Sequence, residues 1–223
     1  INPFRIGFPS FLSSLLNMSR RRKLVLATHN PHKKREMSAL LSHLGITIVG
    51  LDDFPQIGEI EETGTTLFEN SLIKARTVHK ITGLPALADD TGLEVDALDG
   101  APGVYSARYA GKNPSYQDNI NKLLFELKGL KLEKRNARFR TVISYIDDNV
   151  ELHSEGVIEG VITLESKGKE GFGYDPVFQP ESYSCTFAEM NQDEKNLISH
   201  RARALEKMKK ILEPYFDKGE YIG

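Results

Sequence analysis

The chain has 223 residues, 39% of them hydrophobic and 27% charged, which is ordinary for a globular enzyme with a buried core. Its formal net charge of -2 excludes a whole-chain basic excess that would follow a nucleic-acid backbone. The single Cys185 excludes an internal disulfide and a multi-cysteine zinc site. No apolar run approaches the roughly 20 residues of a membrane-spanning helix, so we expect no membrane partner. The net charge gives no reason to expect a nucleic-acid partner. We expect a cytoplasmic location.

Residues 1–22 differ from the rest, since they are rich in serine and apolar residues and contain no acidic residue. The simpler interpretation is an upstream extension ahead of a start at Met18. The alternative is a fragment of an organelle-targeting leader, which would make an organellar location possible. We therefore expect a single domain over residues 23–223.

The first predicted elements alternate between strand and helix. Residues 23–28 (KLVLAT) form an apolar run long enough for a buried strand. Asn30-Pro31 follows, a pair typical of the N-cap and first turn of a helix. That helix is expected to end near Gly45, and residues 46–49 predict a second strand.

A second helix is predicted to begin at Thr65 or Thr66 and to end at Gly83. Its inward-facing stripe is expected to consist of Phe68, Leu72 and Ala75. On its polar face Asn70 and Lys74 lie one turn apart, where they could reach a common pocket or merely face solvent.

The second half of the chain mixes strands and helices. A short apolar strand, 86–88, is expected to run directly into Asp89 and Asp90. Residues 114–127 predict a helix whose inward side chains are Ile120, Leu123, Leu124 and Leu127. Residues 137–146 and 150–158 predict a β-hairpin, and residues 193–212 predict one long closing helix. Together these patterns indicate an α/β protein with a mixed sheet.

The passage from the first strand to the first helix could bind phosphate. It consists of Thr28, His29, Asn30, Pro31, His32 and Lys33. Backbone N–H groups and the positive end of a helix can face an anion there, and Lys33 adds a full charge. The segment is not a Walker A loop. The alternative is an ordinary helix start with a solvated basic face.

Two adjacent carboxylates stand in Asp89-Asp90-Thr91-Gly92. Such a pair is unfavourable after a buried strand unless a cation or protonation relieves the repulsion. In an extended backbone the two side chains point to opposite sides, so only one needs to enter a site. Gly92 would let the chain bend away. The alternative is a solvated junction between strand and turn.

Further carboxylates, Glu61 and Glu62, precede the second helix. Mg²⁺ characteristically binds one or two carboxylates together with substrate phosphates and water. One of these glutamates and one of the two aspartates satisfy that count. The alternative is a loop with solvated charges, and the residues do not distinguish Glu61 from Glu62 as the ligand.

Two later segments could recognise a nucleobase. Phe172 stands between two glycines, and an exposed ring there could stack on a base, which is worth about 1–3 kcal/mol. Asp175 could accept a hydrogen bond from a base N–H. Further along, Lys195 suits a phosphate, while His200 and Arg201 can donate to a ring carbonyl. The alternatives are a tight loop with core aromatics and a surface helix with solvated charges.

Seven segments, taken in order, closely resemble the inosine/xanthosine triphosphate pyrophosphatase family, also called the Ham1-like family. They are Ala27-Thr28-x-Asn30-x-x-Lys33, Glu61-x-Thr63-Gly64, Phe68-Glu69-Asn70, residues 87–93 (LADDTGL), residues 100–108 (GAPGVYSAR), residues 171–175 (GFGYD) and Ser199-His200-Arg201. The resemblance extends from about Lys23 to about Leu212. Thr91 departs from it, because serine is common at that position, and residues 1–22 have no counterpart.

This resemblance implies an elongated α/β fold of two lobes around a long mixed β-sheet with flanking helices, as in Ham1-like and Maf-like proteins. The nucleotide is expected in the cleft between the lobes. The resemblance also implies a homodimer and Mg²⁺ as the cofactor. The reaction it implies is hydrolysis of a nucleoside triphosphate to the monophosphate and pyrophosphate.

The resemblance also implies roles for individual residues, carried over from the matching motifs. Asp90 is expected to be the general base and a metal ligand, with Glu61 as the companion ligand. Phosphate contacts are expected from residues 28–33, Lys74 and Lys195, and Thr91 is expected beside the nucleotide. The base pocket is expected to consist of Phe172, Gly173, Tyr174, Asp175, His200 and Arg201.

The expected function is hydrolysis of the non-standard purine nucleotides ITP, dITP and XTP, which cleanses the nucleotide pool. Water would attack the α-phosphorus with pyrophosphate as the leaving group. Two alternatives stay open, a Maf-type pyrophosphatase for other modified nucleotides and a non-catalytic nucleotide sensor. Glu61 and Asp90 disfavour the sensor, because a pure binder of polyanions gains nothing from unpaired acids.

Overall fold

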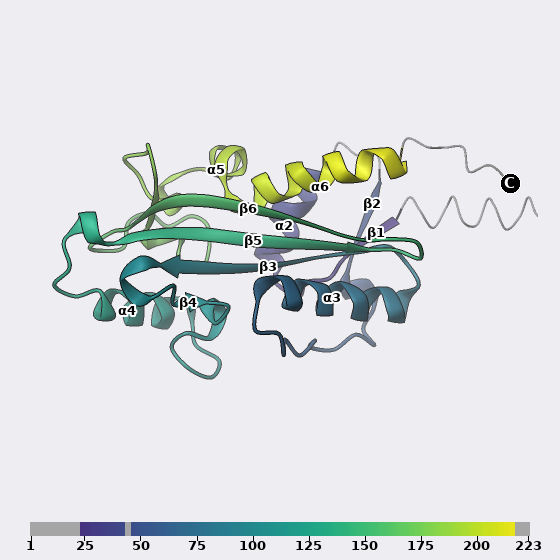
Figure 1. Ribbon diagram of the computed structural model, residues 1–223, viewed down its shortest axis with the longest axis horizontal. Coiled ribbons are helices and arrows are strands. Elements are labelled where there is room, and N and C mark those ends of the chain that lie inside the picture. Colours follow the sequence, from purple (N-terminus) through teal and green to yellow (C-terminus); the bar gives the residue numbers. More distant parts are fainter. Residues whose placement is uncertain (1–22, 43–45, 217–223) are drawn as a thin grey trace, which may run out of the picture.

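A computed structural model of the chain describes residues 23–42 and 46–216. Its centre is a seven-stranded mixed sheet with the order β2-β1-β3-β5-β6-β7, in which β4 also pairs with β3. The molecule is elongated along β3, β5 and β6, with α6 beside one face of the sheet and α3 beside the other (Figure 1). The predicted α/β class with a mixed sheet is confirmed. None of the described helices is long and apolar enough to cross a membrane.

The amino-terminal part contains β1 (Lys23–Leu26), α2 (Pro31–Leu41), β2 (Thr47–Gly50) and α3 (Leu67–Thr82). As predicted, Asn30 caps α2, because its side-chain oxygen accepts the backbone N–H groups of His32 and Lys33. Thr66 and Glu69 form a reciprocal capping box at the start of α3. The predicted helix end near Gly45 lies outside the described residues, and α2 itself ends at Leu41.

The buried face of α3 differs from the predicted apolar stripe. Phe68 is 39% exposed and lies against His153, so its predicted inward position is wrong. The side chains that face the sheet include the polar residues Asn70, Ser71 and Lys74. The helix is therefore rotated relative to the purely hydrophobic pattern, because these polar groups find partners on the sheet.

The central strand is much longer than the predicted 86–88. β3 (Ala86–Val95) pairs antiparallel with β5 (Asn136–Ile146) along its whole length. Asp89 and Asp90 therefore lie in mid-strand, and the predicted bend at Gly92 is wrong. Continuous pairing with β5 satisfies this backbone, which outweighs the local turn preference of the Asp-Asp-Thr-Gly segment.

The predicted hairpin is confirmed and is extended at its open end. β5 turns into β6 (Glu151–Ile162) at Asp147, whose carboxylate accepts the backbone N–H groups of Asn149 and Val150. β7 (Phe178–Pro180) pairs with the end of β6. On the remaining edge of β6, Lys207 and Arg203 donate to the backbone carbonyls of Glu155 and Val157. These two side chains protect an edge that could otherwise pair with another chain.

Further elements are short turns and the helix α4 (Tyr116–Glu126), which confirms the helix predicted over 114–127. Single 3-10 turns lie at Leu51–Asp53, Asp96–Leu98, Ser106–Arg108, Leu132–Lys134, Asp175–Val177 and Phe187–Glu189. β4 is the two-residue strand Pro102–Gly103.

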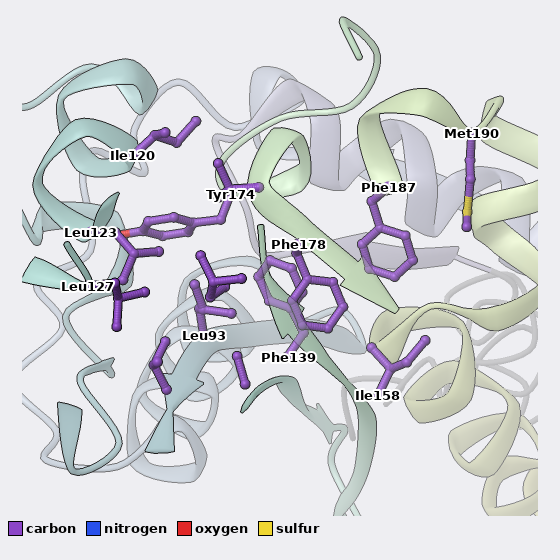
Figure 2. Close-up of a cluster of buried hydrophobic side chains, with 14 residues drawn as sticks. Leu93, Ile120, Leu123, Leu127, Phe139, Ile158, Tyr174, Phe178, Phe187 and Met190 are labelled. Carbon is purple, nitrogen blue, oxygen red and sulfur yellow. The ribbon is translucent and has the colours of Figure 1, made fainter. Parts of the chain in front are cut away.

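Three hydrophobic clusters hold the layers together. The largest joins one face of the sheet to α4 and to the segment after β6, and Figure 2 shows its aromatic centre. Its members include Leu93, Ile120, Leu123, Leu127, Phe139, Ile158, Tyr174, Phe178, Phe187 and Met190. The second lies under α2 and α6 and the third under α3, so both faces of the sheet are covered at the β1 end. The core thus extends along the length of the molecule.

The single closing helix predicted over 193–212 is wrong. The structure has α5 (Gln192–Ile198) and α6 (His200–Phe216), separated by Ser199 in an extended conformation with ψ 156°. The Ser199 hydroxyl accepts the backbone N–H of Ala202 and so caps α6. This break directs His200 and Arg201 into the protein, where they are 3% and 1% exposed.

Gly156 is required where α6 crosses β6. A β-carbon at this position would lie 2.1 Å from the His200 carbonyl oxygen and 2.4 Å from the Ala204 nitrogen, both backbone atoms. We expect Gly156→Ala to lower the free energy of unfolding by at least about 1–3 kcal/mol, the usual range for overpacking. Urea denaturation measures this change. Gly58→Ala is the control, because a β-carbon there meets nothing within 4 Å. Equal stability of the two variants would contradict the close approach.

Candidate active site

The site lies at a gap in the sheet beside β3. β1 pairs with β3 only at Ala86 and Leu87, and β4 pairs with it only at Leu93 and Glu94. Between these pairs, residues 88–92 have no strand on this edge among residues 23–42 and 46–216. β1 ends beside the gap, and residues 27–30 connect it to the start of α2. Crevices at the carboxyl ends of such strands are common ligand sites in α/β proteins.

Asp89 and Asp90 point to opposite faces of β3, which confirms the alternation expected of an extended backbone. The Asp90 carboxylate faces α3, with Oδ1 3.1 Å from Lys74 Nζ and Oδ2 3.4 Å from Asn70 Nδ2. Asn70 Oδ1 accepts the backbone N–H of Gly64 at 2.8 Å, so its amide group presents a donor to Asp90. Asn70 therefore connects Asp90 to the loop that carries the glutamate pair.

Asp89 lies on the other face of β3, where it forms ion pairs with two cations. Its Oδ2 is 3.1 Å from Lys33 Nζ and 3.1 Å from Arg201 Nη2. Burial opposes ionisation, but Lys33, Arg201 and Lys74 outweigh it and lower the pKa of Asp89. Its Oδ1 is buried and has no hydrogen-bond partner within the described chain. Asp89 is therefore a permanent anion that fixes two cations beside the gap.

The pKa of Asp90 is shifted in the opposite direction. Burial raises it and outweighs the lowering effects of Lys74 and Lys33, while the nearby Glu62 raises it further. Two neighbouring carboxyl groups whose pKa values are pushed apart are typical of a site that divides acid–base work from charge holding. Of the two aspartates, Asp90 has the properties of a base.

The glutamate pair is placed asymmetrically. Glu62 Oε1 lies 2.8 Å from Lys74 Nζ, the same nitrogen that contacts Asp90. Glu61 is exposed. Two carboxylates thus share a single ammonium group, which leaves an excess of negative charge at this point. No group of three or more histidine, cysteine or acidic side chains that could hold a metal is present in the part of the chain that the structure describes.

A second ionic network lies behind the first and contains Glu36, which the sequence patterns did not single out. Glu36 is 3% exposed, with Oε1 2.9 Å from Lys195 Nζ and Oε2 bonded to Arg201 Nη1. Lys195 Nζ is also 2.6 Å from Asp175 Oδ2. Burial alone would raise the pKa of Glu36, but Arg201 and Lys195 outweigh it and lower that pKa. In the sequence, Glu36 is simply an acid beside Met37, a residue that the structure buries.

Lys33 and Lys195, both predicted phosphate contacts, belong to this connected system. Asp89 bonds both Lys33 and Arg201, and Glu36 bonds both Arg201 and Lys195. The predicted neighbour Thr91 lies at the same place, with Oγ1 3.1 Å from Asp89 Oδ2. Six side chains of alternating charge therefore form one connected chain from the partly exposed Lys33 on α2 to the buried Asp175. The structure brings these predicted residues together, and what they bind stays a prediction.

Three predicted base-pocket residues have protein partners in this structure. Tyr174 is 4% exposed, belongs to the large core cluster and donates its hydroxyl to the Ser106 carbonyl at 3.0 Å. The Asp175 carboxylate accepts Lys195 and the backbone N–H of Phe172, and burial raises its pKa despite Lys195. Phe172 itself is stacked on His32. The direct base contacts expected of Tyr174 and Asp175 stay untested, and here both residues support the Phe172 loop.

The other predicted residues differ in how exposed they are. His29 is exposed and its ring nitrogen contacts the Gly58 carbonyl at 3.0 Å, while Pro31 begins α2. Gly173 adopts a left-handed conformation with φ 63°, which favours glycine at that position. His200 is enclosed by aromatic rings, with its centroid 4.6 Å from Phe139. Its Nδ1 has no partner among the described residues.

Comparison with known proteins identifies the family of this chain. A model of the Ham1 family matches residues 24–211. The chain belongs to the Ham1 family. A dITP/XTP pyrophosphatase of Porphyromonas gingivalis is 51% identical over 190 residues, covering 85% of this chain and 97% of that protein. A dITP/XTP pyrophosphatase of Desulforamulus reducens is 50% identical over 191 residues, covering 85% and 95%. The structure of a HAM1 protein from Coxiella burnetii superposes with a TM-score of 0.78 at 46% identity, covering 86% of this chain and 98% of that chain.

The buried His200 of this Ham1 family chain makes its stability depend on pH. Burial, followed by the cations of Arg201 and Lys195, holds the pKa of His200 well below its usual 6.5. The unfolded chain therefore binds a proton below about pH 6.5 that the folded chain refuses, so stability falls as pH falls through that value, by about 1.4 kcal/mol per unit. Above about pH 6.5 His200 is neutral in both the folded and the unfolded chain, so it no longer makes stability depend on pH.

The variant His200→Gln, which stays uncharged, isolates this contribution because all other histidines are unchanged. We expect the difference in Tm between the unaltered chain and the variant to shrink between about pH 7.5 and about pH 5.5. Thermal unfolding at several pH values measures it. A difference that stays constant over this range would show that His200 does not resist protonation in the folded state.

Proposed function

We propose that this chain hydrolyses the non-standard purine nucleotides ITP, dITP and XTP to the monophosphate and pyrophosphate. The observation that carries this proposal is the buried Asp90 carboxylate of raised pKa, set beside Glu62 and Lys74 at the gap in the sheet. Relatives about half identical over nearly their whole length are named dITP/XTP pyrophosphatases, which supports this class of substrate. We further propose that the active form is a homodimer.

The acidic donors suit Mg²⁺. Asp90 and Glu62 share one ammonium group, so a second cation would offset the remaining negative charge between them. Mg²⁺ takes oxygen ligands and is usually held by one or two carboxylates, with phosphate and water completing the shell. We assign Asp90 and one glutamate of the Glu61–Glu62 pair as the residues that would hold it. When bound, it would offset phosphate charge and lower the pKa of nearby water.

Asp90 then acts as the general base. Its raised pKa makes it a better proton acceptor near neutral pH than an exposed aspartate. Asn70 and Lys74 hold its two oxygens from the α3 side, which orients the carboxylate without blocking the open edge of β3. In this role Asp90 orients the water that attacks the α-phosphorus and accepts its proton, while pyrophosphate leaves.

Cations already fixed in the protein stabilise the phosphates. Lys33 lies at the start of α2 and is held by Asp89, and its side chain is 16% exposed. Lys74 lies on the opposite face of β3 beside Asp90. Because these charges are held by ion pairs before the substrate arrives, they need little reorganisation as negative charge develops on the leaving group. Lys195, the other predicted phosphate contact, is buried more deeply, and its Nζ lies 4.9 Å from the centroid of the Phe172 ring.

Selection among purines depends on hydrogen bonding. Hypoxanthine and xanthine carry a 6-keto oxygen, and adenine carries an amino group there. A donor from His200 or Arg201 would be left unpaired by adenine, which can discriminate by about 10⁴-fold. Guanine shares the 6-keto oxygen, so its rejection must depend on its 2-amino group.

A panel of nucleotides tests the proposed function. We expect kcat/KM for ITP, dITP and XTP to exceed that for ATP and GTP, with pyrophosphate and not phosphate as the product. Equal kcat/KM values across the panel would contradict the cleansing role, and preference for modified pyrimidines would favour the Maf-type alternative. Binding of ITP without turnover at saturating Mg²⁺ would identify a nucleotide sensor. Sedimentation analysis tests the homodimer.

A further inference from the structure

Three aromatic side chains meet over the site, and each comes from a different segment. Phe172 belongs to the glycine-flanked loop, His32 to the first turn of α2 and Tyr116 to the first turn of α4. The ring of His32 is stacked on Phe172 with a centroid distance of 5.1 Å and an interplanar angle of 18°. Tyr116 lies at the border of both, 6.4 Å from His32 and 6.1 Å from Phe172. We refer to these three residues as the aromatic trio.

Asn30 determines where Tyr116 is held. The side-chain oxygen of Asn30 accepts the backbone N–H groups of His32 and Lys33, which leaves its amide group as the outward donor. That amide group lies 3.4 Å from the Tyr116 hydroxyl. Tyr116 thus connects α4 to the start of α2, and its ring stays at the rim of the site while it is 44% exposed.

Phe172 is fixed from the opposite side. Its backbone N–H donates to the Asp175 carboxylate at 2.8 Å. Lys195 Nζ lies 4.9 Å and Arg201 Cζ 5.7 Å from the centroid of its ring. Two buried cations therefore lie over the ring of Phe172 and help to hold it in place.

His32 occupies the place that such a base needs. A centroid distance of 5.1 Å with nearly parallel planes is direct contact between two rings, so no third ring fits between them. A purine that stacks on this face of Phe172 must replace the imidazole. Tyr116 meets both rings at steep angles of 67° and 49°, so it borders the space that opens when they separate.

We propose that Tyr116 is a base-contacting residue and that the bound base takes the place of His32 against Phe172. The His32–Phe172 stack opens, the purine replaces the imidazole against Phe172, and Tyr116 packs against the bound base. This inference rests on the proposed function, because it requires a purine nucleotide as the ligand. Aromatic faces accept any base, so Tyr116 contributes affinity and does not select among purines. Selection among purines then depends on the hydrogen-bonding groups proposed above, His200 and Arg201.

The experiment compares Tyr116→Ala with the unaltered chain. We expect KM for ITP and for XTP to rise by the same factor of about ten, within the range for loss of one base–aromatic contact, while kcat changes less than about twofold. Inhibition by inorganic tripolyphosphate, which has no base, should keep its inhibition constant. Tyr116→Phe should recover most of the affinity, because the ring makes the contact. Phe125→Ala is the control on the same helix, where Phe125 is 74% exposed, and should leave KM unchanged.

Two results would overturn the assignment of Tyr116. One is a KM for ITP within about twofold of the original value. The other is equal weakening of ITP and tripolyphosphate, which would make Tyr116 only a contact between α4 and α2. If the unaltered chain hydrolysed no ITP, the proposed function would fail instead. In that case, calorimetric binding of IMP tests the role of Tyr116 separately. We expect IMP to bind Tyr116→Ala about tenfold more weakly than the unaltered chain. Equal binding to both chains, or binding to neither, would overturn the proposal.

Discussion

Replacing Asp90 by Asn is expected to lower kcat for ITP by at least about 10³-fold. A positioned general base contributes about 10²–10⁴-fold, and in the proposed mechanism the same carboxylate also holds the cation. Asparagine has nearly the same shape but cannot accept a proton at neutral pH or offer a charged metal ligand. The measurement is pyrophosphate release with Mg²⁺ raised until the rate no longer changes.

The fold of this variant should remain intact. Burial already opposes ionisation of Asp90, and Lys74 keeps its contact with Glu62 when the charge at Asp90 is lost. We therefore expect Tm to change by only a few degrees, in the range that about 1 kcal/mol produces in a domain of this size. Asp96→Asn, at a half-exposed carboxylate just after β3, is the matched control and should retain full activity. Hydrolysis by Asp90→Asn within about tenfold of the original rate would show that another group is the base.

Glu36→Gln is expected to cause the largest loss of stability. Glu36 is the only acid that bonds both Lys195 and Arg201 in the described part of the chain, and all three side chains are at least 97% buried. Removing one partner of a buried ion pair costs about 3–5 kcal/mol, because the remaining charge stays in a poorly solvating interior. At about 2–4 °C per kcal/mol, Tm should fall by roughly 10 °C.

Two further variants separate this effect from a general sensitivity to charge. Asp52→Asn removes the exposed partner of Lys34, and should leave Tm unchanged because water solvates both groups. Lys195→Met should cost less in the Glu36→Gln background than in the unaltered chain, because the two side chains interact. Additive effects of Glu36→Gln and Lys195→Met would contradict a shared network.

Much of the site could be predicted from local patterns. The two aspartates alternate across an extended backbone, so their opposite orientations followed from adjacency alone. The cap at Asn30 followed from the polar residue before Pro31, and it places the start of α2 beside the gap. Such features involve residues a few positions apart, which a sequence displays directly.

Other features depend on partners far along the chain. The length of β3 depended on β5, whose pairing stabilises an Asp-Asp-Thr-Gly segment that would otherwise favour a turn. The buried face of α3 depended on Asp90 and Ser144, which provide partners for its polar residues. Tyr116 stands 86 residues from Asn30, and no local signal distinguished it from other aromatic residues at helix starts.

By itself the sequence determined the fold class, the starts of α2 and α3, the hairpin and the family, because short-range periodicity, capping and ordered motifs carry that information. Only the tertiary structure decided which charged groups are buried together and which glutamate faces Asp90. Glu36 and Arg201 are separated by 165 residues, and their contact exists because the break at Ser199 turns α6 towards α2. A buried charge is tolerated only where a partner of opposite sign reaches it, and that depends on how the whole chain packs.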